Sequence, residues 1–405
     1  MVNRMNVLVI LLSGQHIPNL LSVEAVKPDK IAYVETEDMK KSRAWSNLEK
    51  ALEISNIKVE AESFQLKEEN SINAIKRIFT KIKDQFCDDD ITVNLTGGTK
   101  LMSIGAYDVF KDTSAQMIYK PFRYVNEFVD LEKDCKVKFK SDLSIRQFLR
   151  GYGYEISESD EEIENHLKDC SILFDLSLYI AENHNINAIR GCISNLTRIN
   201  AGRNSGDLII DISDGLRTSD VTLKKFLVGH LGMRSLNEEI LHGRLSRKVV
   251  RFLTGEWLEI FIWGLLDKFS MDLGFRNPLH SLTILKRNES GVTKNELDVV
   301  FLKGTKFCIV ECKTGKQNAD EDASNVIYKL KSIMEQTRAL DVGSYLVTTS
   351  DNIIGIDGNI KRHIASRMDE YGVNIIQSRD VRNFALAYRK RNFLQLKRDL
   401  SKFFK

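Results

Sequence analysis

The chain of 405 residues is two to three times as long as a typical domain, which predicts two or three folded units. Its composition is 42% hydrophobic and 28% charged, with 23 Gly and 4 Pro, which excludes disordered, collagen-like and low-complexity proteins. The formal net charge of +3 neither requires nor excludes a polyanionic partner. Only the distribution of charge along the chain can indicate whether the protein binds one.

Six cysteines are scattered through the chain, and only Cys308 and Cys312 lie close together in sequence. This spacing does not predict a disulfide framework. The first apolar run, residues 7–12, is far too short for a transmembrane helix, and no small-residue cleavage site follows it. We therefore expect a reduced, soluble, cytoplasmic protein with no membrane association.

Residues 1–120 alternate short β-branched runs with helical patterns. This rhythm is typical of βαβ units and predicts a mostly parallel, Rossmann-like sheet. Ligands of such sheets bind in loops at the carboxyl ends of the strands. We expect strands at residues 5–12, 31–35, 91–95 and 115–120, and helices at residues 42–55 and 71–86.

Three polar loops follow expected strands, at residues 13–19, 35–37 and 96–100. The last reads Thr-Gly-Gly-Thr-Lys and precedes a helical pattern. A glycine pair at a strand-to-helix junction lets backbone N–H groups approach an anion, and the helix N-terminus adds a favourable dipole. The string matches neither a Walker loop nor GxGxxG, and on its own it has low specificity.

From about residue 141 the pattern changes. Ser144 and Gln147 fit a capping box that opens a short helix, and residues 163–245 have a mainly helical pattern without a motif that indicates chemistry. We expect three units: an α/β domain at 1–140, a helical connecting or dimerisation region at 141–244, and a further domain at 245–405.

The last region forms a second α/β unit. A strong helical pattern covers residues 255–269, and a long helix is expected at the C-terminus. Two apolar runs, 297–302 and 306–310, flank a turn at Gly304 and predict a β-hairpin. We also expect strands at residues 282–287 and 344–349 and a helix at 328–340.

The hairpin predicts a cluster of charged side chains. Glu311 and Lys313 lie two residues apart on one strand and therefore share a face, while Cys312 points the other way. The hairpin partner can place Asp298 beside them. Two close carboxylates repel unless a cation lies between them, and Mg²⁺ or Mn²⁺ is the usual solution. A lysine there can bind the attacking water or stabilise charge on phosphorus.

The spacing Asp298-x12-Glu311-x-Lys313 resembles the core of the PD-(D/E)xK nucleases. The resemblance implies that Asp298 and Glu311 bind metal, that Lys313 is catalytic, and that an acid on the preceding helix adds a catalytic metal ligand. Glu259 is the first candidate for that acid and Glu256 the second. No proline precedes Asp298, which departs from the motif. Three further interpretations stay open: Glu296 as an accessory ligand, Gln336 as a site residue, and an ordinary solvated ion pair in place of catalysis.

The string LTGGTKLMS, together with the loop after the first strand, resembles the CARF domain, which senses cyclic oligoadenylates in type III CRISPR defence. With the nuclease core, the chain resembles the CARF-nuclease effectors of those systems, in which a two-fold ring, mostly cyclic tetra-adenylate, binds across a homodimer. The ligand candidates that this resemblance implies are Ser13, Gln15, Asn19, Thr36, Thr96, Gly97, Gly98, Thr99, Lys100 and Ser103. Lys100 would neutralise phosphate.

Residues 361–405 contain 12 Lys and Arg against 4 Asp and Glu, a net charge of +8. Tyr388, Phe393, Phe403 and Phe404 are interleaved with these charges. Such a segment can run along a nucleic-acid backbone, or it can be an amphipathic helix whose aromatic side chains pack on its own domain.

The expected function is a metal-dependent nuclease, activated by a cyclic oligoadenylate, that cleaves single-stranded RNA or DNA, with nicking of duplex DNA also open, and with low sequence specificity. The alternatives are a sensor that binds nucleic acid without cutting it, and a sensor domain that opens its own ring with help from Thr99 and Lys100. The seven histidines are dispersed in sequence, and no second cysteine pair or nearby histidine completes a zinc site with Cys308 and Cys312. His16, in the first loop, is expected to be packed or solvated.

Overall fold

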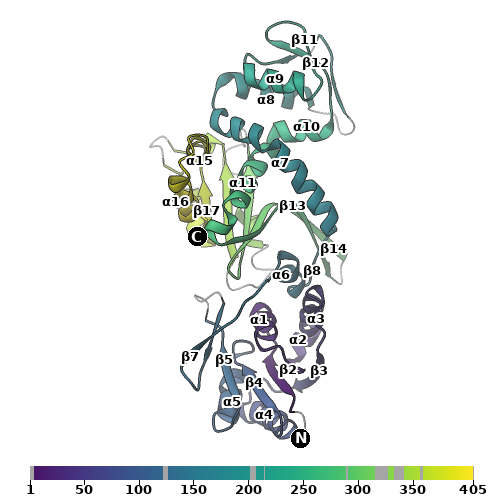
Figure 1. Cartoon of the computed structure of the whole chain (residues 1–405), viewed down its shortest axis with the longest axis vertical. Coiled ribbons are helices and arrows are strands. Elements are labelled where there is room, and N and C mark those ends of the chain that lie inside the picture. Colours follow the sequence, from purple (N-terminus) through teal and green to yellow (C-terminus); the bar gives the residue numbers. More distant parts are fainter. Residues whose placement is uncertain are drawn as a thin grey trace.

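The computed structural model describes residues 4–121, 126–200, 207–213, 215–288, 291–314, 327–332, 342–355 and 359–404. The molecule is elongated, with the N-terminal domain at one end, the C-terminal sheet in the middle and a small subdomain at the other end (Figure 1). None of the described helices combines the length and the apolar composition that crossing a bilayer requires.

The N-terminal domain is built on a seven-stranded sheet with the order β3-β2-β1-β4-β5-β6-β7. The first five of these strands in space are parallel, as expected, and the last two add an antiparallel edge. The strands are β1 (Asn6–Leu11), β2 (Lys30–Thr36), β3 (Glu60–Leu66), β4 (Asp90–Asn94), β5 (Gln116–Tyr119), β6 (Glu127–Asp130) and β7 (Cys135–Lys138).

Both faces of this sheet are covered, which explains why β1 is apolar at every central position. Val7 and Val9 belong to the core on one side, and Leu8 and Ile10 to the core on the other, as the two-residue period of a strand requires. The helices are α1 (Ile17–Val26), α2 (Glu37–Lys41), α3 (Ala44–Ile54), α4 (Ile72–Gln85) and α5 (Lys100–Phe110). Helices α4 and α5 pack on the first side, and α1 and α3 on the second.

The C-terminal domain contains a six-stranded sheet with the order β17-β16-β15-β14-β13-β8. The expected hairpin is β14–β15, and Gly304 turns it with a φ of 64°. Strands β15, β16 and β17 are parallel, whereas β8, β13, β14 and β15 are antiparallel. The strands are β8 (Tyr154–Ile156), β13 (Phe275–Asn288), β14 (Gly291–Lys303), β15 (Lys306–Lys313), β16 (Val342–Thr348) and β17 (Val373–Ile376).

Helices cover this second sheet. The apolar helix α11 lies beside β13, β14 and β15 and packs against the long helix α7 (Figure 1). The helices of this part are α7 (Asp160–Asn183), α10 (Arg247–Arg251), the π-helix η1 (Phe252–Glu256), α11 (Trp257–Lys268), α12 (Ser270–Leu273), the short 3-10 helix η2 (Asp351–Ile353), α14 (Arg362–Tyr371), α15 (Ser378–Arg389) and α16 (Phe393–Phe403).

The middle region contains more strand than its helical pattern predicts. Besides α7, α8 and α9 it holds a small antiparallel sheet at the far end of the molecule, and β8 joins the C-terminal sheet. The strands were hard to recognise because two of them are only two residues long. The elements of the subdomain are α8 (Asn187–Asn200), β9 (Leu208–Ile210), β10 (Leu216–Arg217), α9 (Val221–Gly229), β11 (Arg234–Ser235) and β12 (Ile240–Leu245).

The two large domains share a core at α6 (Ile145–Gly151). This helix begins with the predicted capping box of Ser144 and Gln147. Its Phe148 stacks on Phe307 of β15 with the ring centroids 5.0 Å apart. A single apolar cluster continues from β1 of the N-terminal sheet into β14 and β15. The division at residues 140 and 244 stays a prediction.

The basic C-terminal segment packs on its own domain. Phe404 contacts Phe275 and Phe301, and Tyr388 contacts Phe174. The amphipathic interpretation of this segment therefore accounts for its aromatic residues.

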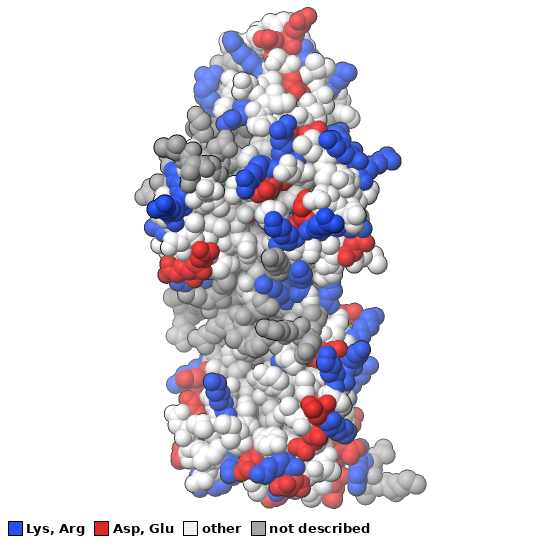
Figure 2. Space-filling view, turned by 90° about the vertical axis from the view of Figure 1, so that its left-hand side faces the viewer, with Lys and Arg blue, Asp and Glu red and all other residues white. Residues whose placement is uncertain are grey.

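On the face shown in Figure 2, Lys and Arg side chains are interspersed with Asp and Glu over the length of the molecule.

Candidate functional site

The hairpin β14–β15 brings the three residues of the nuclease motif together. Lys313 Nζ lies 3.5 Å from Asp298 Oδ2 and 3.3 Å from Glu311 Oε2. The backbone N–H of Cys312 donates a hydrogen bond of 2.7 Å to Asp298 Oδ2, which fixes this carboxylate to the neighbouring strand. The arrangement follows from strand alternation, because Glu311 and Lys313 share a face while Cys312 packs in the core.

Lys329 completes the charge balance around Glu311. The Glu311 side chain is 0% exposed, and its Oε1 lies 2.6 Å from Lys329 Nζ. The same ammonium donates to the main-chain oxygen of Glu296 over 3.1 Å, so it ties the described segment 327–332 to β14. No motif spacing in the sequence marks Lys329. Gln336, whose role as a site residue was left open, lies outside the described residues.

A cavity of about 250 Å³ opens beside the motif, and four carboxylates line it. Glu259 of α11 and Asp298 of β14 are two of them, so the helix acid and the strand aspartate face one space. The other two are Glu256 and Glu296. The Arg251 guanidinium lies 2.9 Å from Glu256 Oε1, and the Ser281 hydroxyl donates a hydrogen bond of 2.9 Å to Glu296 Oε1. Glu311 and Lys313 are on β15 and do not belong to the lining.

A π-helix lies directly before α11, next to this cavity. Residues Phe252–Glu256 form a π-helix, a rare element that often occurs at functional sites. Thr314, the residue after Lys313, donates to the main-chain oxygen of Thr254 over 3.1 Å. The end of β15 is therefore held against the start of the helix that carries Glu259.

Burial and mutual repulsion dominate the electrostatics of the cavity. Burial, and then the charge of Glu311, raises the pKa of Asp298. Burial, and then the charge of Asp298, raises the pKa of Glu259 well above its ordinary value. Burial opposes the charge of Lys313, but Asp298 and Glu311 outweigh it and raise the pKa of that ammonium. The site thus holds crowded carboxylates beside a firmly protonated lysine.

This donor set fits a hard divalent cation. Carboxylate oxygens are the ligands that Mg²⁺ and Mn²⁺ prefer, and a cation would offset both the cost of burying the ionised carboxylates and their mutual repulsion. Asp298, Glu259 and Glu311 are the residues that could hold it. Glu259 Oε2 also lies 3.3 Å from Nε2 of His280, a buried residue of β13 that the sequence analysis did not connect with the site.

A second candidate site lies at the carboxyl ends of β1, β2 and β4, the edge that the three polar loops share. Gly97 is required there, because a Cβ at this position would lie only 2.1 Å from the main-chain oxygen of Leu11. Gly98 has a φ of 71°. Thr99 caps α5 by accepting from the N–H of Met102, and Ser103 donates to the main-chain oxygen of Gly97 over 3.2 Å.

Some of the expected ligand residues form hydrogen bonds that hold the loops together. Asn19 is buried and donates to the main-chain oxygen of Leu11 over 3.0 Å. Asn94 donates to Asn19 Oδ1 over 3.1 Å and accepts from the Thr96 hydroxyl over 2.7 Å. His16 is also buried and packs on Tyr152, as expected of a packed residue. This buried network joins the first loop to the glycine loop.

Other residues of these loops reach solvent. Thr99 and Lys100 are exposed, and Ser13 and Gln15 are half-buried. Lys120, by contrast, is buried. It directly follows β5, and its backbone N–H donates to Thr96 Oγ1 over 2.8 Å. No motif in the sequence connects it with these loops. Burial lowers the pKa of Lys120 to about 8 against the opposing effect of Glu127.

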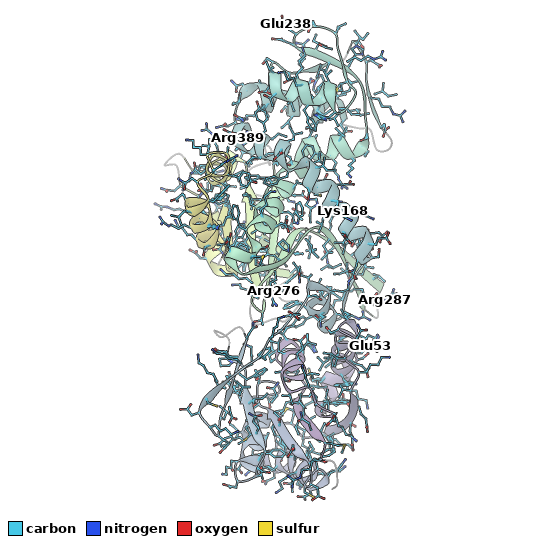
Figure 3. All side chains as sticks on the ribbon, in the orientation of Figure 1. Glu53, Lys168, Glu238, Arg276, Arg287 and Arg389 are labelled. Carbon is cyan, nitrogen blue, oxygen red and sulfur yellow. The ribbon has the colours of Figure 1, made fainter. Side chains whose placement is uncertain are left out.

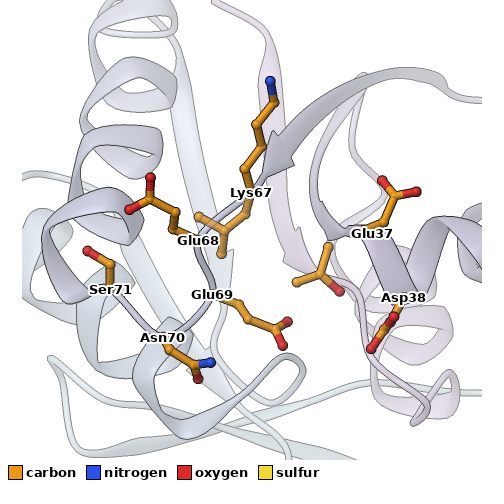
Figure 4. A pocket seen from close by; sticks show the side chains of 9 residues that line it. Glu37, Asp38, Lys67, Glu68, Glu69, Asn70 and Ser71 are labelled. Atoms are coloured by element: carbon orange, nitrogen blue, oxygen red, sulfur yellow. The ribbon is translucent and has the colours of Figure 1, made fainter.

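Thr36 faces a different cavity, of about 550 Å³, between the ends of β2 and β3. Figure 4 shows Glu37 and Asp38 on one side and Glu68 and Glu69 on the other, with Lys67 between them. The charged lining is therefore acidic apart from Lys67, and the role of Thr36 as a ligand residue stays a prediction. The side chain of Thr36 accepts from the N–H of Met39 and caps α2.

The fold and these two sites define a protein that joins a Rossmann-like ligand-binding domain to a PD-(D/E)xK-type nuclease domain. Residues 7–148 match the family model of the Card1 CARF domain, and residues 246–379 match that of the Card1-like endonuclease domain. The chain therefore belongs to the proteins that combine a Card1-type CARF domain with a Card1-like endonuclease domain.

Solved structures share this fold over nearly the whole chain. Can2 from Sulfobacillus thermosulfidooxidans, in complex with cyclic tetra-adenylate, has a TM-score of 0.70 at 19% identity and covers 99% of both chains. VC1899 from Vibrio cholerae has a TM-score of 0.76 at 16% identity and covers 98% of both. A type III CRISPR defence DNA nuclease activated by cyclic oligoadenylate has a TM-score of 0.51 at 14% identity, over 90% of this chain and 51% of that one. A comparison with curated proteins finds no match.

Proposed function

We propose that this protein is a metal-dependent endonuclease of type III CRISPR defence that a cyclic oligoadenylate, most simply cyclic tetra-adenylate, activates through the CARF domain. The proposal rests on the joint presence of the two domain families in one chain. The observation that carries it is the cluster of Asp298, Glu311 and Lys313, with Lys313 Nζ within 3.5 Å of both carboxylates.

The CARF site offers groups for a phosphodiester ring. Backbone N–H groups of the Gly97-Gly98 loop and the N-terminus of α5 favour an anion, and Lys100 can neutralise a phosphate. Ser13 and Gln15, with Thr99, are the side chains that can recognise the rest of the ring. Asn19, Thr96 and Ser103 position these loops through the hydrogen bonds described above. Can2, which has the same fold, binds cyclic tetra-adenylate, and this supports the choice of ring.

At the nuclease site, Mg²⁺ or Mn²⁺ held by Asp298, Glu311 and Glu259 would supply charge stabilisation for the scissile phosphate and lower the pKa of a water. Lys313, whose ammonium stays protonated, binds the attacking water or the developing negative charge on phosphorus. Lys329 holds the Glu311 carboxylate in place. Burial of Glu311 and Asp298 keeps bulk water from screening these interactions.

A homodimer is part of the proposal, because a two-fold ring is matched by a two-fold protein. Helix α5 carries exposed apolar side chains on one face, Leu101, Ile104 and Tyr107, and Ile104 is 58% exposed. This face begins next to Lys100, so a second copy that covers it would bring two ring-binding loops together. All six cysteines are free thiols, which suits a reducing cytoplasm.

We propose single-stranded RNA or DNA as the substrate, with low sequence specificity and with nicking of duplex DNA as a further activity. The cavity beside Asp298 is lined by carboxylates and one exposed arginine, Arg251, and offers no set of base-reading groups among its lining residues. Arg251 can contact a phosphate on either side of the scissile bond.

The test uses the full-length protein with labelled single-stranded RNA and DNA and a supercoiled plasmid, in Mn²⁺ or EDTA, with and without cyclic tri-, tetra- and hexa-adenylate. We expect cleavage only with metal and one ring. A Glu311→Ala, Lys313→Ala double variant should lose cleavage and keep ring binding, whereas Glu164→Ala, Lys168→Ala, which removes an exposed ion pair on α7, should keep both. Ring binding without cleavage by the wild-type protein would instead support the non-cutting sensor.

A further inference from the structure

Two residues of one helix and a third that is distant in sequence form a compact cluster beside the nuclease site. His166 and Cys170 lie one turn apart on α7 and share a face of that helix, and His280 reaches them from β13. The distances are 2.7 Å from His166 Nε2 to His280 Nδ1, 3.6 Å from Cys170 Sγ to His166 Nε2, and 3.5 Å from Cys170 Sγ to His280 Nδ1. Cys170 and His280 are buried, and His166 is half-buried.

The chemistry of this cluster differs from that of the nuclease cavity. Thiolate and imidazole are the ligands of zinc and related metals, whereas Mg²⁺ and Mn²⁺ prefer carboxylate and water. Zinc sites with three protein ligands take them from histidine, cysteine and carboxylate side chains and keep a fourth position for water. The cluster therefore suits a metal that the carboxylates of the nuclease site do not select.

The separations also suit a tetrahedral ion. Zinc bonds of about 2.3 Å to sulfur and about 2.0–2.1 Å to nitrogen place sulfur and nitrogen ligands about 3.6 Å apart. The two observed sulfur to nitrogen distances are 3.5 and 3.6 Å. The two imidazole nitrogens lie 2.7 Å apart and would have to separate to about 3.3 Å. A small rotation of His166, which is the least buried of the three, can provide this.

The ring of His280 connects the cluster to the nuclease site. Its Nδ1 faces the cluster, and its Nε2 lies 3.3 Å from Glu259 Oε2. A histidine that binds a metal through one nitrogen commonly donates its other N–H to a carboxylate, which fixes the orientation of both groups. The Glu259 carboxylate is close enough to take this role after a small adjustment, and it also lines the cavity beside Asp298.

We propose that His166, Cys170 and His280 form a site for one zinc-class divalent cation, and that this cation, through His280, orients Glu259 at the nuclease site. The cation joins α7 to β13, and its ligands on these two elements are more than a hundred residues apart in the chain. Binding at this site is independent of the proposed function, whereas the effect on Glu259 rests on it. In this role His280 is a positioning residue.

Metal binding is tested on the full-length protein after removal of bound metals with a chelator. Co²⁺ is then added as a spectroscopic probe and displaced by Zn²⁺. We expect one equivalent of Co²⁺ per chain to give the thiolate-to-cobalt charge-transfer band and the visible bands of a tetrahedral ion. Cobalt bound to the carboxylates of the nuclease cavity cannot produce the thiolate band, so the two sites are distinguished.

Two cysteine variants of similar burial provide the comparison. Cys170→Ser should lose the charge-transfer band and weaken Zn²⁺ binding at least about tenfold. Cys192→Ser, which changes a buried thiol of α8 outside the cluster, should keep both. Absence of the band in the wild-type protein, or its survival in Cys170→Ser, would overturn the site and leave a hydrogen-bonded histidine pair beside a buried thiol.

The effect on Glu259 is measured separately, as the Mn²⁺ concentration that gives half-maximal cleavage. With Zn²⁺ bound, the wild-type protein and Cys192→Ser should need the same Mn²⁺ concentration, and Cys170→Ser should need about tenfold more. Equal Mn²⁺ requirements for all three proteins would refute the orienting role. If no protein cleaves any substrate while the cobalt band is present, the proposed function fails and the metal site stands.

Discussion

Arg276 of β13 donates a hydrogen bond of 2.8 Å to the main-chain oxygen of Ser141, at the point where the chain passes from the CARF domain to α6. Figure 3 labels Arg276 at the junction of the two domains. The same guanidinium donates to the main-chain oxygen of Gly304 over 2.6 Å, and Ser141 Oγ donates to Glu24 of α1 over 2.7 Å. A hydrogen-bonded path therefore runs from the helix that follows the first ligand loop to the turn of the catalytic hairpin.

We predict that Arg276→Ala uncouples the two domains. The variant should bind the ring as the wild-type protein does, while activation of cleavage at saturating ring falls about tenfold, within the usual range of coupling energies. Arg287→Ala is the matched control, because Arg287 lies on the same strand with its side chain 70% exposed and pairs only loosely with Glu155 at 3.6 Å. Full activation of a folded Arg276→Ala variant would contradict this route.

The glycine loop provides a second prediction. Gly97→Ala should displace the loop, because the new methyl group would lie 2.1 Å from the Leu11 oxygen, and should cost about 1–3 kcal/mol of stability. Ring binding, measured by calorimetry, should weaken at least tenfold. Gly229→Ala at the end of α9, where nothing lies within 4 Å of the added Cβ, should change neither quantity. Equal ring affinities for the two variants would remove the glycine loop from the binding site.

Local sequence patterns predicted the central strands of the N-terminal sheet but not its edge strands. Strand β1 contains a continuous apolar run, residues 7–11, because it is buried on both faces, and such a run is easily recognised. Strand β3 was missed because only Phe64 and Leu66 are buried in a segment that carries two glutamates. Edge strands with one half-covered face have little hydrophobic signal of their own.

The same contrast between local patterns and long-range packing holds for the residues of the nuclease site. Asp298, Glu311 and Lys313 lie on one hairpin, so strand alternation was enough to bring them together. His280 and Lys329 reach the site from other elements, and the sequence gives no spacing that relates them to it. Contacts over such distances depend on packing, which single-sequence patterns do not describe.

The exposed face of α5 leads to a prediction about assembly. If a second copy covers this face, Ile104→Glu should place a charge in the interface, convert the dimer to a monomer and weaken ring binding. Ile172→Glu is the control, since Ile172 on α7 is even more exposed, at 78%. Light scattering after size exclusion gives the mass of each. A dimeric Ile104→Glu variant with normal ring affinity would place the interface elsewhere.

Lys329 is expected to matter for catalysis although it is outside the motif. Without its ammonium, the buried carboxylate of Glu311 loses its 2.6 Å partner, and its orientation toward Lys313 is no longer fixed. Lys329→Ala should therefore reduce the rate of cleavage about a hundredfold, as the loss of other electrostatic groups in active sites does. Lys331→Ala, which removes a lysine that lies over Tyr371 instead, should reduce it less than about threefold. Similar rates for the two variants would show that Lys329 is only structural.

The raised pKa of Asp298 leads to a prediction about stability and pH. Burial, and then the charge of Glu311, raises this pKa above 3.8, so without metal the ionised carboxylate destabilises the fold. Its penalty is absent at a pH below 3.8 and grows as the pH rises through the raised folded value. Asp298→Asn cannot ionise. In EDTA at about pH 8 the variant should therefore be more stable than the wild-type protein, and the difference should vanish in acid.

Manganese should reverse this order. The wild-type carboxylate can bind the ion and gain about 2.7 kcal/mol at a hundredfold excess over the dissociation constant, whereas the amide of Asp298→Asn binds it weakly. Thermal unfolding of both proteins across pH, with EDTA or with Mn²⁺, measures the two effects. If Asp298→Asn is less stable than the wild-type protein in EDTA at every pH, the carboxylate is satisfied by Lys313 and the Cys312 N–H alone, and the crowding of charges does not call for a cation.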